Sequence, residues 1–216
     1  NPKRKCYISS VAAHTLYEKD HPYYLHGPGM VLDLSNCKFE QHSDGVVKVS
    51  GSKFVKQPYT VKLEGSAKVA YRTLVIGGTR DPIAIQNIED IKKDIQDQVA
   101  SYFDDIPRSE YQILFHLYGK NGVMGSLEPV QTPAHELGIV MEVIASSQEL
   151  ANTICSSARS TLMHFPYKGR KATAGNIALL YSPSDIEFGP VYKFTVYHLM
   201  NIDDPCELFP TEFVDL

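Results

Sequence analysis

The strongest constraint on the fold is an amphipathic helix that the sequence predicts over residues 81–103. Asp81 suits the N-cap, where its carboxylate can accept backbone N–H groups, and Pro82 suits the first helical position, where no N–H is needed. Apolar residues then recur at three- and four-residue steps, as they do on the buried face of a helix. They are Ile88, Ile91, Ile95, Val99 and Tyr102. This helix must therefore pack against other elements of a hydrophobic core.

The elements around this helix predict the fold class. Strands are expected over residues 68–76, 111–118, 135–145, 176–181 and 191–200, and Ser146 with Glu149 forms the capping box of a second helix. From Tyr71 onward the order is strand, helix, strand, strand, helix, strand. In a ferredoxin-like βαββαβ sandwich of this order, two helices cover one face of an antiparallel sheet. We therefore expect an α+β chain with a ferredoxin-like domain over residues 79–216.

Residues 1–78 are predicted to form an antiparallel, β-hairpin-rich segment after a first helix over residues 9–18. Asp44-Gly45 favours one hairpin, because this dipeptide accepts the positive φ angles of a tight turn. Gly65-Ser66 separates two further strand-like runs and predicts a second hairpin. Since the chain begins with Asn-Pro rather than methionine, we interpret this segment as the end of a larger core domain in a longer protein.

Charge and composition argue against several classes of protein. A formal net charge of -4 gives no general basic face for nucleic acid or a membrane surface. No apolar run approaches the ~18 residues of a membrane span, and no signal peptide is recognisable. The four cysteines lie far apart without a CxxC pair, which is typical of reduced thiols in the cytoplasm. No P-loop or dinucleotide fingerprint is present, so the sequence names no cofactor.

Residues 167–197 predict a site for an anionic ligand. Three cations surround a glycine and small polar residues follow, so side chains and backbone N–H groups can converge on one phosphate or carboxylate. Further polar residues are expected to shape the opposite loop. The candidates are Lys168, Arg170, Lys171, Asn176, Ser182 and Asp185. A solvated turn or an interface between chains is the alternative interpretation.

A polar sheet face gives a second candidate site. Lys62 and Glu64 alternate with apolar residues, so both point to one face of a strand. Arg72 on the next predicted strand can lie near the same face, where its guanidinium can form a bidentate hydrogen bond with a carboxylate. We predict that Lys62 and Arg72 bind substrate, with a solvent-exposed face as the alternative.

His14 and Glu18 stand four residues apart on the first predicted helix, where their side chains would share a face. Histidine suits proton transfer near neutral pH, so the two residues are candidates for a catalytic acid/base pair. A hydrogen bond on the helix surface is the alternative. No metal site is predicted, because His116 and His135-Glu136 lack the paired helical histidines of zinc hydrolases.

Several blocks of the chain resemble the acyclic terpene utilisation protein A family, specifically the C-terminal half of its longer members. They include HTLYEKDHPYYLHGPG at residues 14–29, YRTLVIGGTRDP at residues 71–82 and HELGIVMEVIASSQELANTICSSAR at residues 135–159. The resemblance implies a role in the breakdown of branched acyclic terpenoids or related acids and thioesters. It implies no particular reaction.

Two functional hypotheses follow. The first is the C-terminal portion of a catabolic enzyme that acts on a branched acyclic acid or its acyl thioester, by hydratase or lyase chemistry. The second is a non-catalytic assembly or ligand-binding module that pairs with a companion subunit or domain. Under either hypothesis we expect a small anionic ligand and an oligomer or hetero-complex, without nucleic acid or membrane.

Overall fold

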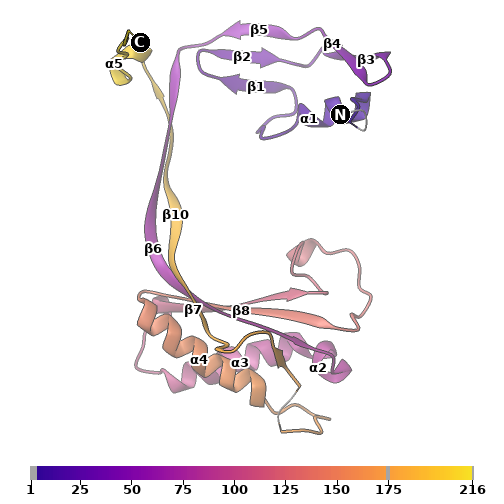
Figure 1. Ribbon diagram of the computed structural model, residues 1–216, viewed down its shortest axis with the longest axis vertical. Coiled ribbons are helices and arrows are strands. Elements are labelled where there is room, and N and C mark those ends of the chain that lie inside the picture. Colours follow the sequence, from indigo (N-terminus) through magenta and orange to yellow (C-terminus); the bar gives the residue numbers. More distant parts are fainter. Residues whose placement is uncertain (1–3, 174–175, 216) are drawn as a thin grey trace. The chain divides into compact units, whose positions relative to one another are not determined.

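The computed structural model describes residues 4–173 and 176–215, which divide into two compact units. The first unit is Asn1–Gly65 together with Phe194–Leu216, and the second is Ser66–Lys193. The division expected after residue 78 falls inside strand β6 (Thr60–Thr79). This strand and β10 (Ile186–Asn201) contribute residues to both units (Figure 1).

The second unit is built on a five-stranded sheet with the order β10-β6-β8-β7. Strand β8 (Leu137–Ala145) lies between β6 and β7 (Tyr111–Tyr118) and is antiparallel to both. The short strand β9 (Ala178–Leu179) pairs with Gly77 and Gly78 of β6. A mixed α/β architecture with an antiparallel sheet, as the sequence predicts, is confirmed.

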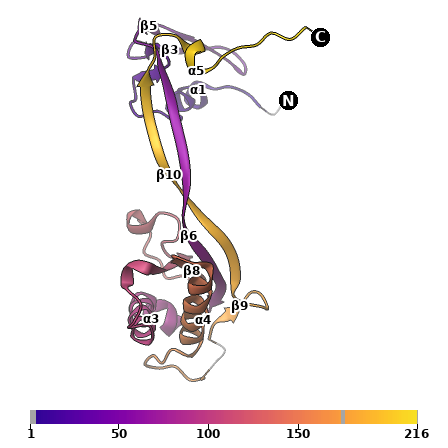
Figure 2. The ribbon, with the colours of Figure 1, turned by 90° about the vertical axis from the view of Figure 1, so that its left-hand side faces the viewer.

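Helices cover one face of this sheet (Figure 1, Figure 2). They are α2 (Pro82–Gln86), α3 (Ile88–Tyr102) and α4 (Gln148–His164). Single 3-10 turns span Arg108–Glu110 and Gly125–Leu127. The odd-numbered residues of β8 pack against the helices and form the centre of the core with Ile95 and Val99. The even-numbered residues of β8 face the opposite side, which we call the open face.

The predicted helix over residues 81–103 is interrupted. Asp81 is its N-cap as expected, and accepts a hydrogen bond from Ile83 N at 2.9 Å. The break comes at Asn87, whose backbone leaves the helical region with φ -101° and ψ 15°. Its backbone N–H and its side-chain amide both donate to Ile83 O. The prediction that Tyr102 is buried is wrong, because it lies exposed in the last turn. The second helix is capped by Ser147, one residue after the predicted Ser146.

The first unit contains the small elements of the N-terminal segment. Strands β1 (Tyr24–Gly27), β2 (Met30–Asp33) and β5 (Lys53–Lys56) form one antiparallel sheet, and β3 (Lys38–Ser43) pairs with β4 (Val46–Ser50). The hairpin predicted at Asp44-Gly45 is confirmed, with Gly45 at φ 75°. Helices α1 (Ile8–His14) and α5 (Pro205–Leu208) complete the unit.

The hairpin predicted at Gly65-Ser66 is wrong. Strand β6 continues through both residues without a turn. A Cβ atom at Gly65 would lie 3.3 Å from Cβ of Val196 on β10. This glycine therefore serves the close approach of a neighbouring strand and not a reversal of the chain.

Within the described part of the chain, no helix is both long and apolar enough to cross a membrane.

Candidate functional site

A carboxylate lies on the open face, between two leucine side chains of the neighbouring strands. Glu142 on β8 has Leu74 of β6 opposite it on one side and Leu114 of β7 on the other. Directly opposite residues of antiparallel strands point to the same face. A single carboxylate therefore lies in a row of leucine side chains.

Glu142 has a side-chain partner on each neighbouring strand. Its Oε1 accepts a hydrogen bond from Nε of Arg72, and its Oε2 lies 2.9 Å from Nε2 of His116. The Glu142 side chain is only 10% exposed, against 28% for Arg72 and 43% for His116. A carboxylate this buried needs ionic and hydrogen-bonding partners, because desolvation of a lone charge is costly. We call these three residues the Arg-Glu-His cluster.

Strand register explains why the three side chains meet. Arg72 lies opposite Ile144, His116 lies opposite Val140, and Glu142 is between these two positions on β8. Arg72 and His116 are therefore the diagonal neighbours of Glu142, within reach of long side chains. The Arg72 guanidinium carbon also lies 5.5 Å from the centre of the Phe188 ring on β10.

This arrangement has a definite chemical capacity. Because the carboxylate engages Nε2 of His116, it fixes the orientation of the ring and leaves Nδ1 to exchange a proton with a ligand. Arg72 contacts Glu142 through Nε, so its terminal nitrogens can donate to a carboxylate or carbonyl oxygen. Half-buried Leu74, Leu114 and Val140 offer carbon surface beside these groups.

The predicted anion-binding loop is held by its own polar groups. The Arg170 guanidinium donates to four backbone carbonyl oxygens, which end α4 and close the loop: Met163, Phe165, Ala172 and Thr173. Lys168 and Lys171 are exposed at the same loop. Ala174 and Gly175 of the predicted motif lie outside the described residues. The described contacts of Arg170 fix the loop, and the predicted anion site remains a prediction.

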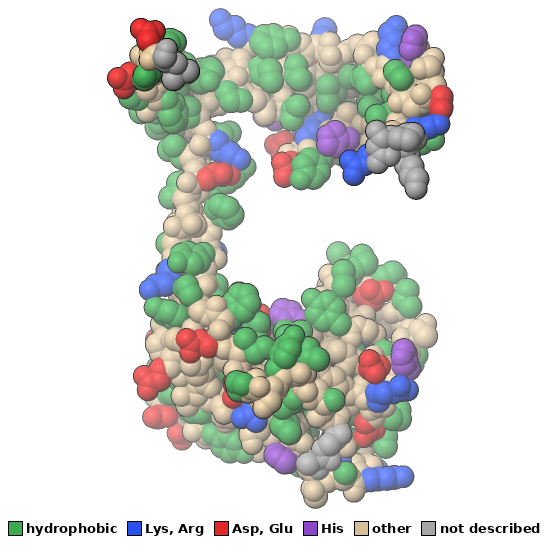
Figure 3. All heavy atoms as spheres, viewed as in Figure 1, with side chains coloured by type: hydrophobic (Ala, Val, Ile, Leu, Met, Phe, Trp, Pro, Cys, Tyr) green, Lys and Arg blue, Asp and Glu red, His purple; other side chains and the backbone are tan. Residues whose placement is uncertain are grey.

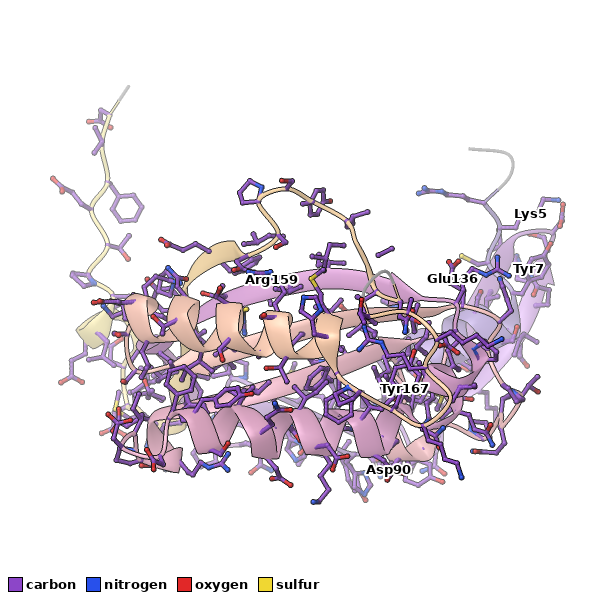
Figure 4. All side chains as sticks on the ribbon, turned by 90° about the horizontal axis from the view of Figure 1, so that it is seen from below. Lys5, Tyr7, Asp90, Glu136, Arg159 and Tyr167 are labelled. Carbon is purple, nitrogen blue, oxygen red and sulfur yellow. The ribbon has the colours of Figure 1, made fainter. Side chains whose placement is uncertain are left out.

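Tyr167 connects this loop to the start of α2. Its hydroxyl donates to Oδ2 of Asp81 at 2.6 Å and accepts a hydrogen bond from the side-chain amide of Asn176. Tyr167 is labelled in Figure 4. The hydrogen bond from Tyr167 holds the pKa of Asp81 below its usual value. Burial, together with Asp81, raises the pKa of Tyr167 to about 12. Asn176 thus donates to the tyrosine of a Tyr167–Asp81 hydrogen bond that the sequence did not reveal.

Asp185 is paired with α4. Its Oδ1 accepts a hydrogen bond from Nε of Arg159 at 2.6 Å, and Arg159 projects from the helix (Figure 4). Ser182 is exposed. The Arg159–Asp185 pair therefore joins the segment before β10 to α4.

The remaining predicted residues lie in the first unit. Lys62 Nζ lies 2.8 Å from Oε1 of Glu64, and this hydrogen bond raises the pKa of Lys62. Helix α1 ends at His14, and Glu18 follows with a φ of 52°. The predicted helix through residue 18 is therefore wrong, and the shared helical face on which the His14–Glu18 pairing rested does not form. The catalytic role of these two residues remains a prediction.

Sequence reasoning missed Glu142, although a signal was present. Glu142 is the one charged residue in the strand LGIVMEVIA, and isolated charges are rarely buried without a partner. Among the described residues, no group of three or more His, Cys, Asp or Glu side chains is arranged to hold a metal ion.

Comparison with known protein families identifies a family for the chain. The family model described as "Acyclic terpene utilisation family protein AtuA" matches residues 4–181. No curated protein and no solved structure matches the chain.

Proposed function

The chain belongs to the acyclic terpene utilisation family, and we propose that it acts on a branched acyclic acid or its thioester at the Arg-Glu-His cluster. The observation that carries this proposal is the burial of Glu142 between Arg72 and His116 on the face of the sheet opposite α2, α3 and α4. Such an arrangement orients one proton-transfer group and one anion-binding group side by side. A branched hydrocarbon suits the leucine and valine side chains around it.

The proposed fold of the second unit is ferredoxin-like. Its elements follow the βαββαβ order, β8 lies between β6 and β7, and the two long helices lie on one face. This topology leaves the opposite face of the sheet available for a ligand or partner. The Arg-Glu-His cluster occupies that face.

The proposed chemistry is addition or removal of water at a branched acyl group. Arg72 holds the carboxylate or the thioester carbonyl oxygen and stabilises the negative charge that develops there. Nδ1 of His116 takes a proton from water, the hydroxyl adds to the β-carbon of an α,β-unsaturated acyl group, and the α-carbon receives a proton. Glu142 positions the imidazole and stabilises its protonated form.

Calorimetric titration with 3-methylbut-2-enoate and its coenzyme A thioester tests the binding part of this proposal. We expect saturable binding that Arg72→Gln weakens at least tenfold, because a charge-assisted contact is lost. Arg108→Gln, at an exposed arginine outside the cluster, serves as the matched control. Equal affinity for Arg72→Gln and the unchanged chain would count against the cluster as the site.

A second candidate function is an assembly module that pairs with a companion subunit or another copy of the chain. It is favoured by apolar side chains that remain exposed on β10, including Phe194 at 70% and Tyr197 at 73%. Figure 3 shows hydrophobic side chains, in green, along β6 and β10. Exposed apolar surface of this kind marks interaction sites. Activity at the Arg-Glu-His cluster and assembly through β10 are compatible with each other.

A further inference from the structure

Strand β10 runs beside β6 and forms an edge of its sheet (Figure 1, Figure 2). Within the first unit, Ile202 N donates to Tyr59 O at 3.1 Å, and a Cβ atom at Gly65 would lie 3.3 Å from Cβ of Val196. Both contacts belong to a single antiparallel register, with no extra residue on either strand between them. Residues 194–201 of β10 therefore form a regular strand.

The backbone groups of an antiparallel strand point alternately toward and away from its neighbour. Because Ile202 is bonded to Tyr59, the even-numbered residues of β10 face β6 in this register. The outward set is odd-numbered: Thr195, Tyr197, Leu199 and Asn201. We call this side the outer edge of β10, and no strand of the described chain pairs with it. It presents a row of backbone donors and acceptors to another strand.

The side chains of residues 194–201 do not protect this edge against pairing. Their sequence, FTVYHLMN, contains no acidic residue, lysine, arginine, proline or glycine, and it is rich in residues that favour strands. Phe194, Val196 and Leu199 are exposed to solvent. Exposed edge strands usually carry charges or proline, which hinder the addition of another strand. This run therefore has the composition of a strand that is covered by a partner.

The opposite edge, on β6, differs in the same unit. Its outward residues include Lys62 and Glu64, whose side chains form an ion pair at 2.8 Å. Charged side chains of this kind disfavour the addition of an apolar strand. One edge of the paired strands is thus charged and the other is uncharged, so we expect strand addition at β10.

We propose that the outer edge of β10 pairs antiparallel with the same edge of a second copy of the chain. This inference rests on the assembly function proposed above and specifies its partner and its contact. Antiparallel pairing of two identical edges has a twofold axis, here near Tyr197, and closes the assembly at a dimer. An uncharged edge suits such an axis, because a charge near the axis would lie close to its own copy. Pairing of β10 with the β6 edge of another copy would instead give an open chain.

Sedimentation equilibrium and amide hydrogen exchange of the whole chain test this proposal. We expect a concentration-dependent dimer. The outward N–H groups of Thr195, Tyr197 and Leu199 should exchange slowly in the dimer and fast after dilution to the monomer, because only the partner strand bonds them.

Thr195→Pro removes one outward N–H and leaves the hydrogen bonds to β6 intact, as proline does at other sheet edges. The twofold axis repeats the change, so two intermolecular hydrogen bonds are lost. We expect the dissociation constant of the dimer to rise about thirtyfold. Thr60→Pro is the matched control, because it makes the same change at an outward position of β6 and should leave the dissociation constant unchanged.

The exchange measurement needs no variant, so it decides the proposal even if Thr195→Pro does not fold. A dimer in which Thr195, Tyr197 and Leu199 exchange as fast as Lys62 and Glu64 would overturn strand pairing and leave assembly through the side chains of β10 intact. A monomer at every concentration would overturn the proposal, and the assembly function would then require a companion subunit. Neither result depends on turnover at the Arg-Glu-His cluster.

Discussion

His116 Nε2 lies 2.9 Å from Oε2 of Glu142, across the neighbouring strands β7 and β8. The carboxylate is almost fully buried, whereas the imidazole remains 43% exposed on the open face. Under the proposed function a ligand on that face contacts the histidine, and the glutamate acts through it. His116 would then be the proton-transfer residue and Glu142 a positioning residue.

Removing either partner of the Arg72–Glu142 pair should lower the free energy of unfolding. The loss should be larger for Arg72 than for Glu142. Arg72→Gln leaves the more buried charge without its main partner, and we expect a loss of about 2 kcal/mol in the free energy of unfolding. Glu142→Gln leaves the more exposed arginine, which water can solvate, and should cost less. Urea unfolding of both variants and of the double variant measures the difference.

The exposed Lys93–Asp97 pair on α3 is the control for this comparison. Its removal should change the free energy of unfolding less than either substitution at the Arg72–Glu142 pair does, as for other surface ion pairs. A larger loss for Glu142→Gln than for Arg72→Gln would contradict the burial argument.

Tyr167→Phe should destabilise the second unit over a defined pH range. The hydrogen bond lowers the pKa of Asp81, so its stabilisation is present above the ordinary value of 3.8 and is lost as pH falls through the lowered pKa. The raised pKa of Tyr167 gives stabilisation that is complete below the ordinary value of 10.0 and is lost as pH rises through about 12.

Between these limits we expect Tyr167→Phe to cost about 1 kcal/mol, the usual net value of a hydrogen bond. Thermal or urea unfolding of the variant and the unchanged chain at several pH values measures this cost across the pH range. The difference between variant and unchanged chain should be flat near neutral pH and shrink in strong acid. A constant difference down to pH values far below 3.8 would show that the charged form of Asp81 is not involved.

Cys155 should resist alkylation in the folded protein. Burial raises the pKa of this thiol to about 12, and the thiolate is the reactive form. Exposed Cys6 and Cys206 should react with iodoacetamide at neutral pH, whereas Cys155 should react only after unfolding. Peptide mass spectrometry measures the three rates, and modification of Cys155 as fast as Cys206 would contradict its burial.

Serine substitution of the exposed aromatic residues on β10 should weaken self-association or binding of a companion subunit. The double variant Phe194→Ser, Tyr197→Ser removes large apolar surface from the first unit. Sedimentation velocity over a range of concentrations measures the assembly state, with Phe213→Ser at another exposed position as the control. Identical behaviour of the double variant and the unchanged chain would argue against β10 as the assembly surface.

Local chemistry made much of the fold predictable. The N-cap at Asp81 and the apolar spacing of α3 are properties of short segments, so they can be recognised without the rest of the chain. Gly65 misled the prediction for the opposite reason. A glycine is typical of turns, but here it accommodates Val196, and only the pairing of distant strands reveals that use.

Contacts between distant strands also explain why the candidate site was only partly predicted from the sequence. Arg72 was predicted as a binding residue from its strand position, but the other two members of the cluster, Glu142 and His116, are 70 and 44 residues away in the sequence. Their proximity depends on the register of three strands. Arg170 had the charge and neighbours expected of an anion site, yet its hydrogen bonds go to backbone carbonyls that only the folded loop brings together.

Turnover of 3-methylbut-2-enoyl coenzyme A tests the central claim most directly. Hydration removes the conjugated double bond, so the loss of its ultraviolet absorbance reports the rate. We predict that His116→Gln, which keeps a donor for Glu142 but cannot exchange a proton at neutral pH, lowers the rate by roughly 10² to 10⁴. His135→Gln, at an exposed histidine, should leave the rate unchanged. No turnover by the unchanged chain, or equal rates for His116→Gln and the unchanged chain, would contradict the account.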